Sequence, residues 1–274
     1  MAKKAVLTNY ELKTDKLDKK LKIALIADLH ERRWDDLLPL IKQAQPDIIM
    51  IAGDTFERYS DEVQEVYLDE DKKKFKPVRW LLFNIAYYIN FLAMIIFQRR
   101  NRPDTERTYE FMREISKIAP VYMSVGNHEQ KFLDEDLKLF KELNIKLLDN
   151  SAESFNFGGE EIFIGGLSTF YDEKFLDRFS ENNGYKILLC HHPIYYERFV
   201  RDKDIDLVLA GHNHGGQVRF RNRGLLSSGE GFFPKYDKGV FEGRLVVSAG
   251  CSGTVAIPRI NNPREIIIIE AGKK

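Results

Sequence analysis

The chain has 274 residues, with 42 lysine and arginine side chains against 42 aspartate and glutamate, so its formal net charge at pH 7 is zero. This balance argues against a general nucleic-acid binder, because such proteins present an excess of basic side chains to the phosphate backbone. Apolar residues make up 43% and charged residues 31%, which is ordinary for a chain forming one large α/β domain. Two cysteines without metal or redox spacing, and an amino terminus that lacks an apolar signal region, predict a cytoplasmic protein.

Short, mostly apolar runs with β-branched residues recur along the chain and predict buried strands. In chain order these runs cover residues 5–12, 22–27, 47–52, 121–125, 185–190 and 205–210. Apolar stripes with helical spacing predict helices at residues 35–45, from Pro103 to Pro120, at 133–143 and at 170–183. A strand, a helix and a strand in succession form the βαβ unit of a parallel sheet.

The second half of the chain adds shorter elements. Alternating runs predict the second half of a two-sheet sandwich at residues 145–148, 154–157 and 162–165. The last third is richer in glycine and predicts strands at residues 217–220, 244–248 and 265–270. Between them, residues 221–238 are predicted to be a loop, which either shapes a substrate entrance or serves as a connection.

Five short polar motifs follow predicted strands and contain every histidine of the chain. They are Asp28-Leu29-His30, Gly53-Asp54, Gly126-Asn127-His128-Glu129, His191-His192-Pro193 and Gly211-His212-Asn213-His214. Taken singly, such a motif is more often a turn or a helix cap than a functional site. Together they favour a functional site, because open α/β sheets place their ligand sites at the carboxyl ends of strands.

The residue types in these motifs predict the kind of ligand. Imidazole, carboxylate and amide oxygen together suit zinc, iron or manganese better than calcium or a structural zinc ion. One ion is too few for roughly seven candidate ligands. Two metal ions about 3.5–4 Å apart, bridged by a carboxylate and a hydroxide, match the number of ligands and are suited to in-line displacement at phosphorus.

The motifs, in this order, resemble those of the calcineurin-like metallophosphoesterase superfamily. Three segments are similar to a bacterial branch that includes cell-envelope phosphohydrolases and UDP-2,3-diacylglucosamine pyrophosphatases: residues 211–217, 236–239 and 258–263. The resemblance implies an α/β fold, a four-layer sandwich of two mixed β-sheets flanked by helices, in a single domain covering residues 1–274. It also implies a metal-dependent phosphohydrolase that acts on a phosphoester substrate.

The resemblance further implies a role for each site residue. The first metal ion is assigned to Asp28, His30 and His214. The second is assigned to Asn127, His191 and His212. Asp54 would bridge the two ions, and His128 would donate to the phosphate or protonate the leaving oxygen. His192 falls outside this set, and so do the two departures from the commoner pattern, Glu129 in place of Asp and Asn213 in place of Thr.

A long apolar insert separates two of the motifs. Residues 80–97 carry no charge and lie in an insert at about 72–102 with lysines and arginines at both ends. By length this run is a candidate for a membrane span, but topology argues against a single crossing, because Asp54 before the insert and Asn127 after it must meet in one site. Three interpretations remain: a helix at the inner face of the membrane, a lid that contacts the acyl chains of a lipid-linked substrate, or a buried crossover helix.

The mechanism predicted from the motifs is direct attack on phosphorus by a hydroxide that bridges two divalent or trivalent metal ions, Mn, Fe or Zn. Two alternatives stay open, a phosphodiesterase of soluble nucleotides and a non-catalytic metal-binding scaffold. The motifs do not separate monoester, diester and pyrophosphate substrates, and they leave the oligomeric state open.

Overall fold

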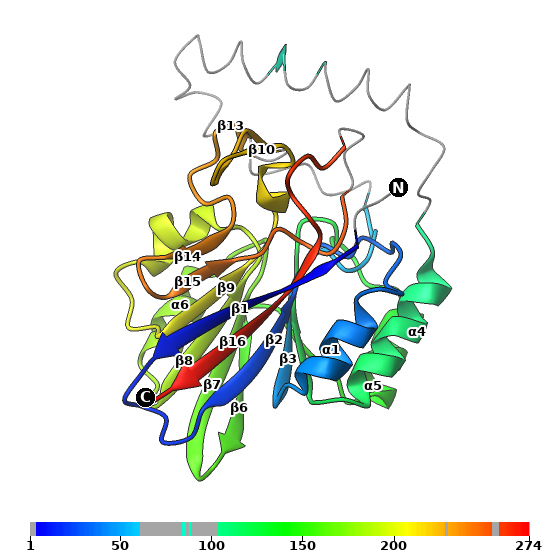
Figure 1. Ribbon diagram of the computed structural model, residues 1–274. Helices are drawn as coiled ribbons and strands as arrows, with labels where there is room; N and C mark the ends of the chain where they lie inside the picture. The colour runs from blue at the N-terminus through cyan, green and yellow to red at the C-terminus, as the bar shows by residue number, and fades with distance from the viewer. Residues whose placement is uncertain are drawn as a thin grey trace.

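Two six-stranded sheets packed face to face form the centre of the protein in the computed structural model (Figure 1). The structure describes residues 4–60, 84, 85, 88, 103–227, 230–253 and 258–273. The side chains between the two sheets form one hydrophobic cluster, in which Ile23 and Leu25 of the first sheet pack with Ile164 and Ile187 of the second. This contact holds the carboxyl ends of the parallel strands of both sheets together at one end of the molecule.

The first sheet is mixed and has the strand order β1-β16-β2-β3-β4-β5. Its strands are β1 (Val6–Lys13), β16 (Glu265–Gly272), β2 (Leu21–Ile26), β3 (Ile48–Ala52), β4 (Val121–Ser124) and β5 (Lys146–Leu148). Only β16 and β2 pair antiparallel in this sheet. Every residue of β3 is buried, as expected for a central strand covered on both faces.

The second sheet is also mixed and has the order β14-β15-β9-β8-β7-β6. Its strands are β14 (Gly239–Phe241), β15 (Leu245–Val247), β9 (Leu207–Ala210), β8 (Tyr185–Cys190), β7 (Glu160–Leu167) and β6 (Ser151–Phe157). The central strands β7, β8, β9 and β15 are parallel, and the two outer pairs are antiparallel. Both sheets therefore bring several parallel strand ends to the same edge.

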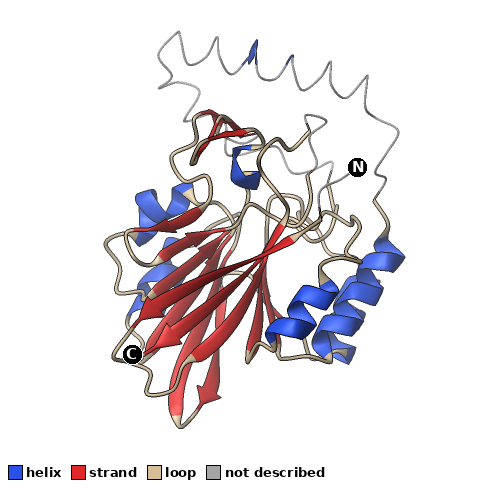
Figure 2. Cartoon of the chain, in the orientation of Figure 1, coloured by secondary structure: helices blue, strands red, loops and turns tan. Residues whose placement is uncertain are grey.

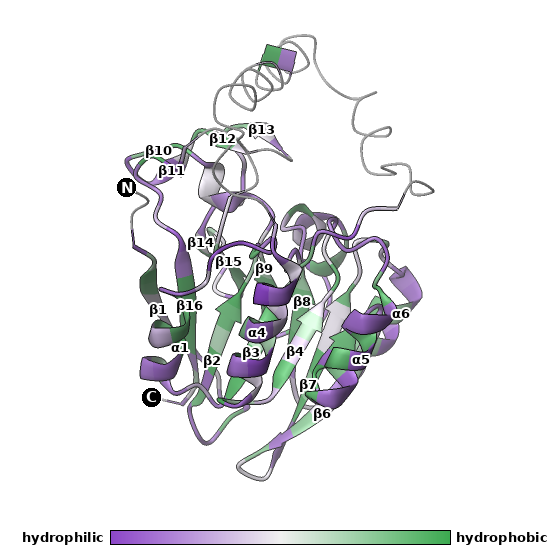
Figure 3. Ribbon diagram, turned by 90° about the vertical axis from the view of Figure 1, so that its right-hand side faces the viewer, coloured by the Kyte–Doolittle hydropathy of each residue, from purple (hydrophilic) through white to green (hydrophobic). Residues whose placement is uncertain are grey.

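Helices cover the outer faces of the two sheets (Figure 2). The first sheet is covered by α1 (Leu38–Ala44), α4 (Thr105–Ser116) and α5 (Asp134–Glu142), whose apolar residues pack on β3 and β4. The second sheet is covered by α6 (Glu173–Ser180) and the π-helical turn η1 (Tyr196–Val200). The central strands are mainly hydrophobic, whereas the helices also carry hydrophilic residues (Figure 3). The four-layer α/β sandwich expected from the sequence is confirmed.

Three elements differ from the prediction. The helix expected at residues 35–45 is shorter, because Pro39 lies in its first turn and the Asp36 carboxylate accepts hydrogen bonds from the Ala5 amide and from Arg264. The strand at 146–148 was expected in the second sheet, but it pairs with β4 in the first. The predicted loop at 221–238 contains parts of two small hairpins, which pair β10 (Arg219–Phe220) with β11 (Arg223–Gly224) and β12 (Leu226–Ser227) with β13 (Gly231–Phe232).

The predicted insert at 72–102, with its apolar run at 80–97, lies outside the described residues except for three helical positions, Asn84, Ile85 and Tyr88. Within the part of the chain that the structure describes, no helix has the length and apolar character needed to cross a bilayer.

Candidate metal centre

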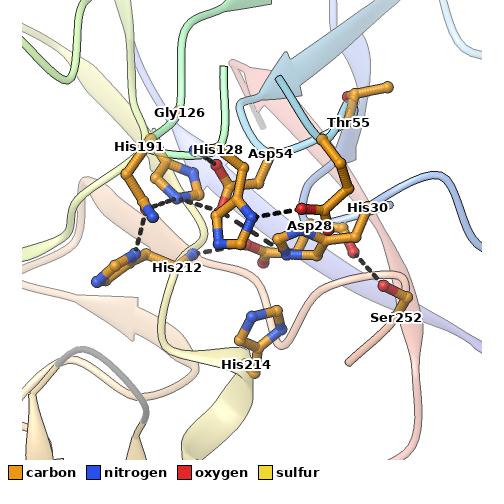
Figure 4. Close-up of polar contacts among 12 residues, drawn as sticks. Asp28, His30, Asp54, Thr55, Gly126, His128, His191, His212, His214 and Ser252 are labelled. Atoms are coloured by element: carbon orange, nitrogen blue, oxygen red, sulfur yellow. Dashed lines mark hydrogen bonds and ion pairs between the residues drawn. The ribbon is translucent and has the colours of Figure 1, made fainter. Parts of the chain in front are cut away.

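The eight predicted site residues lie together where strands of both sheets end. Asp28 and His30 follow β2, Asp54 follows β3, and Asn127 and His128 follow β4. The second sheet contributes one residue after β8 and two after β9, namely His191, His212 and His214. The labelled aspartate and histidine side chains converge on one region (Figure 4). The convergence follows from the topology, because parallel strands bring their carboxyl ends to the same edge.

Three overlapping sets of side chains have the spacing of metal ligands, and the first two described here are called the first and the second group. In the first group, ligand atoms of Asp28, His30 and His214 lie within 4.8 Å of one another. The second group brings together Asp54, His191 and His212 under the same limit. A third set brings together His30, Asp54 and His128. The assignment of particular ligands to two metal ions stays a prediction.

Asp54 belongs to the second group and also approaches His30 of the first group. Its Oδ2 atom is 3.0 Å from His191 Nε2 and 3.7 Å from His30 Nε2. Asn127 belongs to the second group, since its Oδ1 atom is 3.1 Å from His191 Nε2 and 2.9 Å from His212 Nδ1. A carboxylate near both groups and an amide oxygen on one side give each group four candidate ligands, the usual coordination number of zinc.

Unsatisfied polar atoms show that these residues fit a cation. The side chains of Asp28 and His30 are fully buried, yet Asp28 Oδ2 and His30 Nε2 have no hydrogen-bond partner. Buried polar atoms are nearly always paired, and a metal ion at this position would satisfy both. Burial and the neighbouring His191 lower the pKa of His212 to about 3, which keeps its ring neutral as metal binding requires.

The backbone is strained at five of these residues. Asp28, His30, Asp54, His212 and His214 all have left-handed backbone angles, with φ between 46° and 69°. For residues other than glycine this conformation costs about 1–3 kcal/mol each, so the surroundings must hold it in place. One such restraint links the sheets, because the Asp28 carboxylate accepts a hydrogen bond from the His212 amide at 3.0 Å.

The sequence analysis did not identify Glu57, which links His30 of the first group to His128. Its carboxylate lies 3.1 Å from His30 Nδ1 and 2.9 Å from His128 Nδ1. Burial disfavours the ionised carboxylate, but hydrogen bonds from His128 and His30 outweigh it and hold the pKa of Glu57 well below its ordinary value. Because both Nδ1 atoms donate to Glu57, the Nε2 atoms of both rings face the metal region.

Two neighbouring carboxylates favour the protonated form of His128. Burial lowers its pKa, but the carboxylates of Asp54 and Glu57 outweigh burial and raise it to about 9. Its Nε2 atom is 3.8 Å from Asp54 Oδ2, and the half-buried ring lies beside the exposed side chain of Tyr59. Tyr59 donates a hydrogen bond to Glu57 at 2.7 Å. A protonated imidazole at the open side of the site can act as a hydrogen-bond donor or as a general acid.

Glu129 holds the loop that carries Asp54. Its buried carboxylate accepts hydrogen bonds from the amides of Asp54, Thr55 and Phe56 and from that of Gly126, at 2.6–3.0 Å. Burial and the nearby Asp54 raise its pKa to about 7. Glu129 lies outside the candidate ligand groups, and its role in the structure is to fix the backbone around Asp54 and Gly126.

Neither His192 nor Asn213 lies in a candidate ligand group among the described residues. The His192 ring is buried, with Nε2 at 2.6 Å from the Thr169 hydroxyl, and it packs edge to face against His212. Asn213 donates to the Glu230 carboxylate and to the carbonyl of Tyr236. Both side chains support the loops that carry the site.

The described residues on either side of the insert are attached to the rim of the site. Before the insert, the Arg58 amide donates to the His128 carbonyl at 2.7 Å. After it, the Asp104 amide donates to the Glu31 carbonyl at 2.9 Å, next to His30. The described residues that flank the insert therefore lie beside the candidate metal centre.

A buried ion-pair network stabilises this rim. The Arg58 guanidinium donates to Glu31 at 2.7 Å and to Asp136 at 2.8 Å, and all three side chains are at most 7% exposed. We expect Arg58→Met to lower the free energy of unfolding by about 3–5 kcal/mol, because it leaves two buried carboxylates unpaired. Urea unfolding at pH 7 measures the change. In the control Arg33→Met, which removes an exposed pair with Asp35, the change should stay within about 0.5 kcal/mol.

The same network predicts a pH dependence. Burial raises the pKa of Asp136, but hydrogen bonds from Arg58 and Tyr109 outweigh it and hold this pKa below the ordinary 3.8. A depressed carboxylate pKa contributes stability above the unfolded-state value and loses it as the pH falls through the folded-state value. The stability difference between wild type and Arg58→Met should therefore be largest near neutral pH and shrink below about pH 4. A difference that is constant from pH 7 to pH 3 would contradict the assignment.

Comparison with known proteins identifies similar sequences and folds. The family model described as calcineurin-like phosphoesterase matches residues 21–216. The Bacillus subtilis (strain 168) protein YpbG, described as uncharacterized, is 24% identical over 87% of this chain and 75% of its own length. The Escherichia coli (strain K12) protein described as phosphodiesterase YaeI is 24% identical over 91% of this chain and 81% of its own. The solved structure of Haemophilus influenzae NAD nucleotidase aligns with a TM-score of 0.41 and 18% identity, covering 71% of this chain and 38% of that one.

Proposed function

The chain belongs to the calcineurin-like phosphoesterase family and is a metal-dependent phosphohydrolase, and we propose that it acts through a centre of two metal ions. One observation carries the proposal. Mostly buried ligand side chains that follow five strands converge around Asp54, and two of their ligand atoms, Asp28 Oδ2 and His30 Nε2, have no hydrogen-bond partner among the described residues.

The proposed first ion is held by Asp28, His30 and His214. The proposed second ion is held by Asn127, His191 and His212. Asp54 contributes to both. Ions of manganese, iron or zinc in these positions would supply a hydroxide nucleophile near neutral pH and neutralise charge on the phosphoryl oxygens.

The remaining chemistry is assigned to side chains of this chain. Glu57 orients His128, with its Nδ1–H toward the carboxylate and its Nε2 toward the metal region. His128 then donates its Nε2 proton to a phosphoryl oxygen or to the leaving oxygen. Glu129 keeps the Asp54 loop in place during this step, because it holds the amides of three consecutive residues. No serine, threonine or cysteine nucleophile is needed.

We further propose that the substrate is lipid-linked and that hydrolysis takes place at the inner face of the membrane. The described residues that flank the insert containing the uncharged run at 80–97 contact the rim of the site, Arg58 before it and Asp104 after it. The hairpins that follow His214 expose two phenylalanines, Phe220 at 64% and Phe233 at 60%, with the Arg221 guanidinium over the Phe220 ring. Exposed aromatic rings beside arginine suit the boundary between acyl chains and anionic headgroups.

A paired assay tests the substrate class. We expect wild type to float with vesicles that contain phosphatidylglycerol and to hydrolyse a lipid phosphodiester faster than bis(p-nitrophenyl) phosphate. A diester is the first class to test because the E. coli relative is described as a phosphodiesterase. The double variant Phe220→Ser, Phe233→Ser should float less, and Leu137→Ser, an exposed position on α5, should float like wild type. A protein that stays in solution and cleaves only soluble esters would contradict the lipid-linked substrate and direct the search to soluble nucleotides.

A further inference from the structure

The guanidinium group of Arg259 lies against the first candidate ligand group and has fewer hydrogen-bond acceptors than donors. Arg259 Nη2 is 3.4 Å from His214 Nδ1 and donates to the carbonyl oxygen of Ser252. The other two nitrogens, Nε and Nη1, are buried and have no hydrogen-bond partner among the described residues. Unpaired donors on a buried cation are uncommon and unfavourable, so they call for a physical explanation.

The chain around Arg259 is fixed on the loop that carries His214. Asn262 donates through Nδ2 to the His214 carbonyl at 2.7 Å, and the Ile260 amide donates to the Gln217 carbonyl at 3.2 Å. Ile260 also forms a parallel bridge with Val218. The position of Arg259 beside His214 is therefore part of the fold.

The neighbouring carboxylates already have partners or an assigned role. Two carboxylates act electrostatically on Arg259, those of Asp28 and Glu265. Asp28 accepts the His212 amide with Oδ1, and its second oxygen is a candidate metal ligand. Glu265 accepts from the Ala249 amide and pairs with Lys238. Neither offers the guanidinium a free acceptor.

Metal binding would leave the Arg259 guanidinium with even fewer hydrogen-bond acceptors. If one ring nitrogen of His214 binds a metal ion, the other carries a proton, and neither is then an acceptor. The contact between Arg259 Nη2 and His214 Nδ1 can then no longer be a hydrogen bond. In the loaded site, the carbonyl of Ser252 is the remaining acceptor, and most of the donors of the guanidinium need an external anion.

We propose that Arg259 binds an anionic phosphoryl oxygen of the substrate on the His214 side of the centre. The planar guanidinium presents parallel N–H donors that match two phosphate oxygens, and this geometry distinguishes it from a lysine ammonium. The inference rests on the proposed phosphoester hydrolysis at the same site. It adds a substrate-binding residue that no metal ion replaces, because the guanidinium supplies hydrogen bonds as well as charge.

The experiment measures binding of inorganic phosphate to metal-loaded protein by calorimetry, together with metal content and melting temperature. We expect Arg259→Gln to weaken phosphate binding by about 10- to 100-fold while two ions remain bound per chain. Arg259→Lys keeps the positive charge and removes the parallel N–H donors, so it should lose less phosphate affinity than Arg259→Gln. This second variant also provides a test if the glutamine variant does not fold. Arg264→Gln is the matched control, because Arg264 bonds Asp36 and the Arg33 carbonyl away from the site. It should bind phosphate like wild type.

Two outcomes would overturn the proposal. Phosphate affinity in Arg259→Gln within twofold of wild type, with both ions bound, would show that Arg259 does not contact the anion. A loss of affinity that parallels metal loss and returns with excess metal would make Arg259 a positioning residue for His214. Since phosphate binding is measured without turnover, a protein that binds phosphate through Arg259 but hydrolyses no ester would contradict the proposed function alone.

Discussion

Asp54→Asn is expected to abolish phosphoesterase activity, with a fall in kcat/KM of about 10³-fold or more. The carboxylate belongs to the second ligand group and approaches the first, with Oδ2 at 3.0 Å from His191 Nε2 and 3.7 Å from His30 Nε2. The asparagine keeps the size of the side chain and removes the charge that two cations would share. The variant should bind fewer than two metal ions per chain, as measured by elemental analysis after equilibration with Mn, Fe or Zn.

The control for this prediction is Asp149→Asn, an exposed aspartate that follows β5. It should keep wild-type activity and metal content. Chelation of wild type should remove activity, and added metal should restore it in wild type and not in Asp54→Asn. An Asp54→Asn protein with two ions and normal turnover would exclude Asp54 as the bridging ligand and would leave the two-metal proposal without its central residue.

The sequence predicts the strands that deliver the site because these strands are buried on both faces. β3 and β8 are buried along their whole lengths, so their runs contain almost no polar residues and end abruptly at a polar motif. The convergence of the motifs then follows from parallel topology. Elements whose position depends on distant contacts are predicted less well. The three-residue strand β5 has no pattern that identifies its sheet, and its place is decided by pairing with β4.

The spacing of residues in the sequence does not predict the contacts of loop residues, because these contacts depend on the direction in which each side chain points. Glu57 lies three residues after Asp54, and the sequence does not show that it reaches both His30 and His128. Its direction depends on the turn at Asp54, where φ is 56°. Arg259 is 45 positions beyond His214, and it reaches that ring only because the segment before β16 folds back over the loop. A sequence signal was present for Glu57, an acidic residue close to a ligand motif. For Arg259 the signal was its place in the segment 258–263, which resembles a bacterial branch of the superfamily but does not indicate a contact with His214.

We expect His128→Asn to lower kcat by about 10²- to 10⁴-fold and to leave metal content near that of wild type. His128 is the one predicted site residue assigned to proton donation and not to metal binding. Its Nε2 atom faces the metal region, and its Nδ1 atom is held by Glu57 at 2.9 Å. Activity and metal content are measured on the same preparations. Wild-type turnover in His128→Asn would remove this residue from the mechanism.

The variant Glu57→Gln tests whether the proton of His128, and not only the position of its ring, is needed for activity. Glu57 and Asp54 both raise the pKa of His128, which is about 9 in the metal-free protein, so loss of the Glu57 charge should lower it. An acid in the mechanism must be protonated, and activity therefore falls as the pH rises through its pKa. The alkaline limb of the pH–rate profile should move to lower pH in Glu57→Gln, and it should be absent from the residual activity of His128→Asn. If the limb stays in place in Glu57→Gln, His128 acts as a neutral hydrogen-bond donor, and the leaving oxygen takes its proton from solvent.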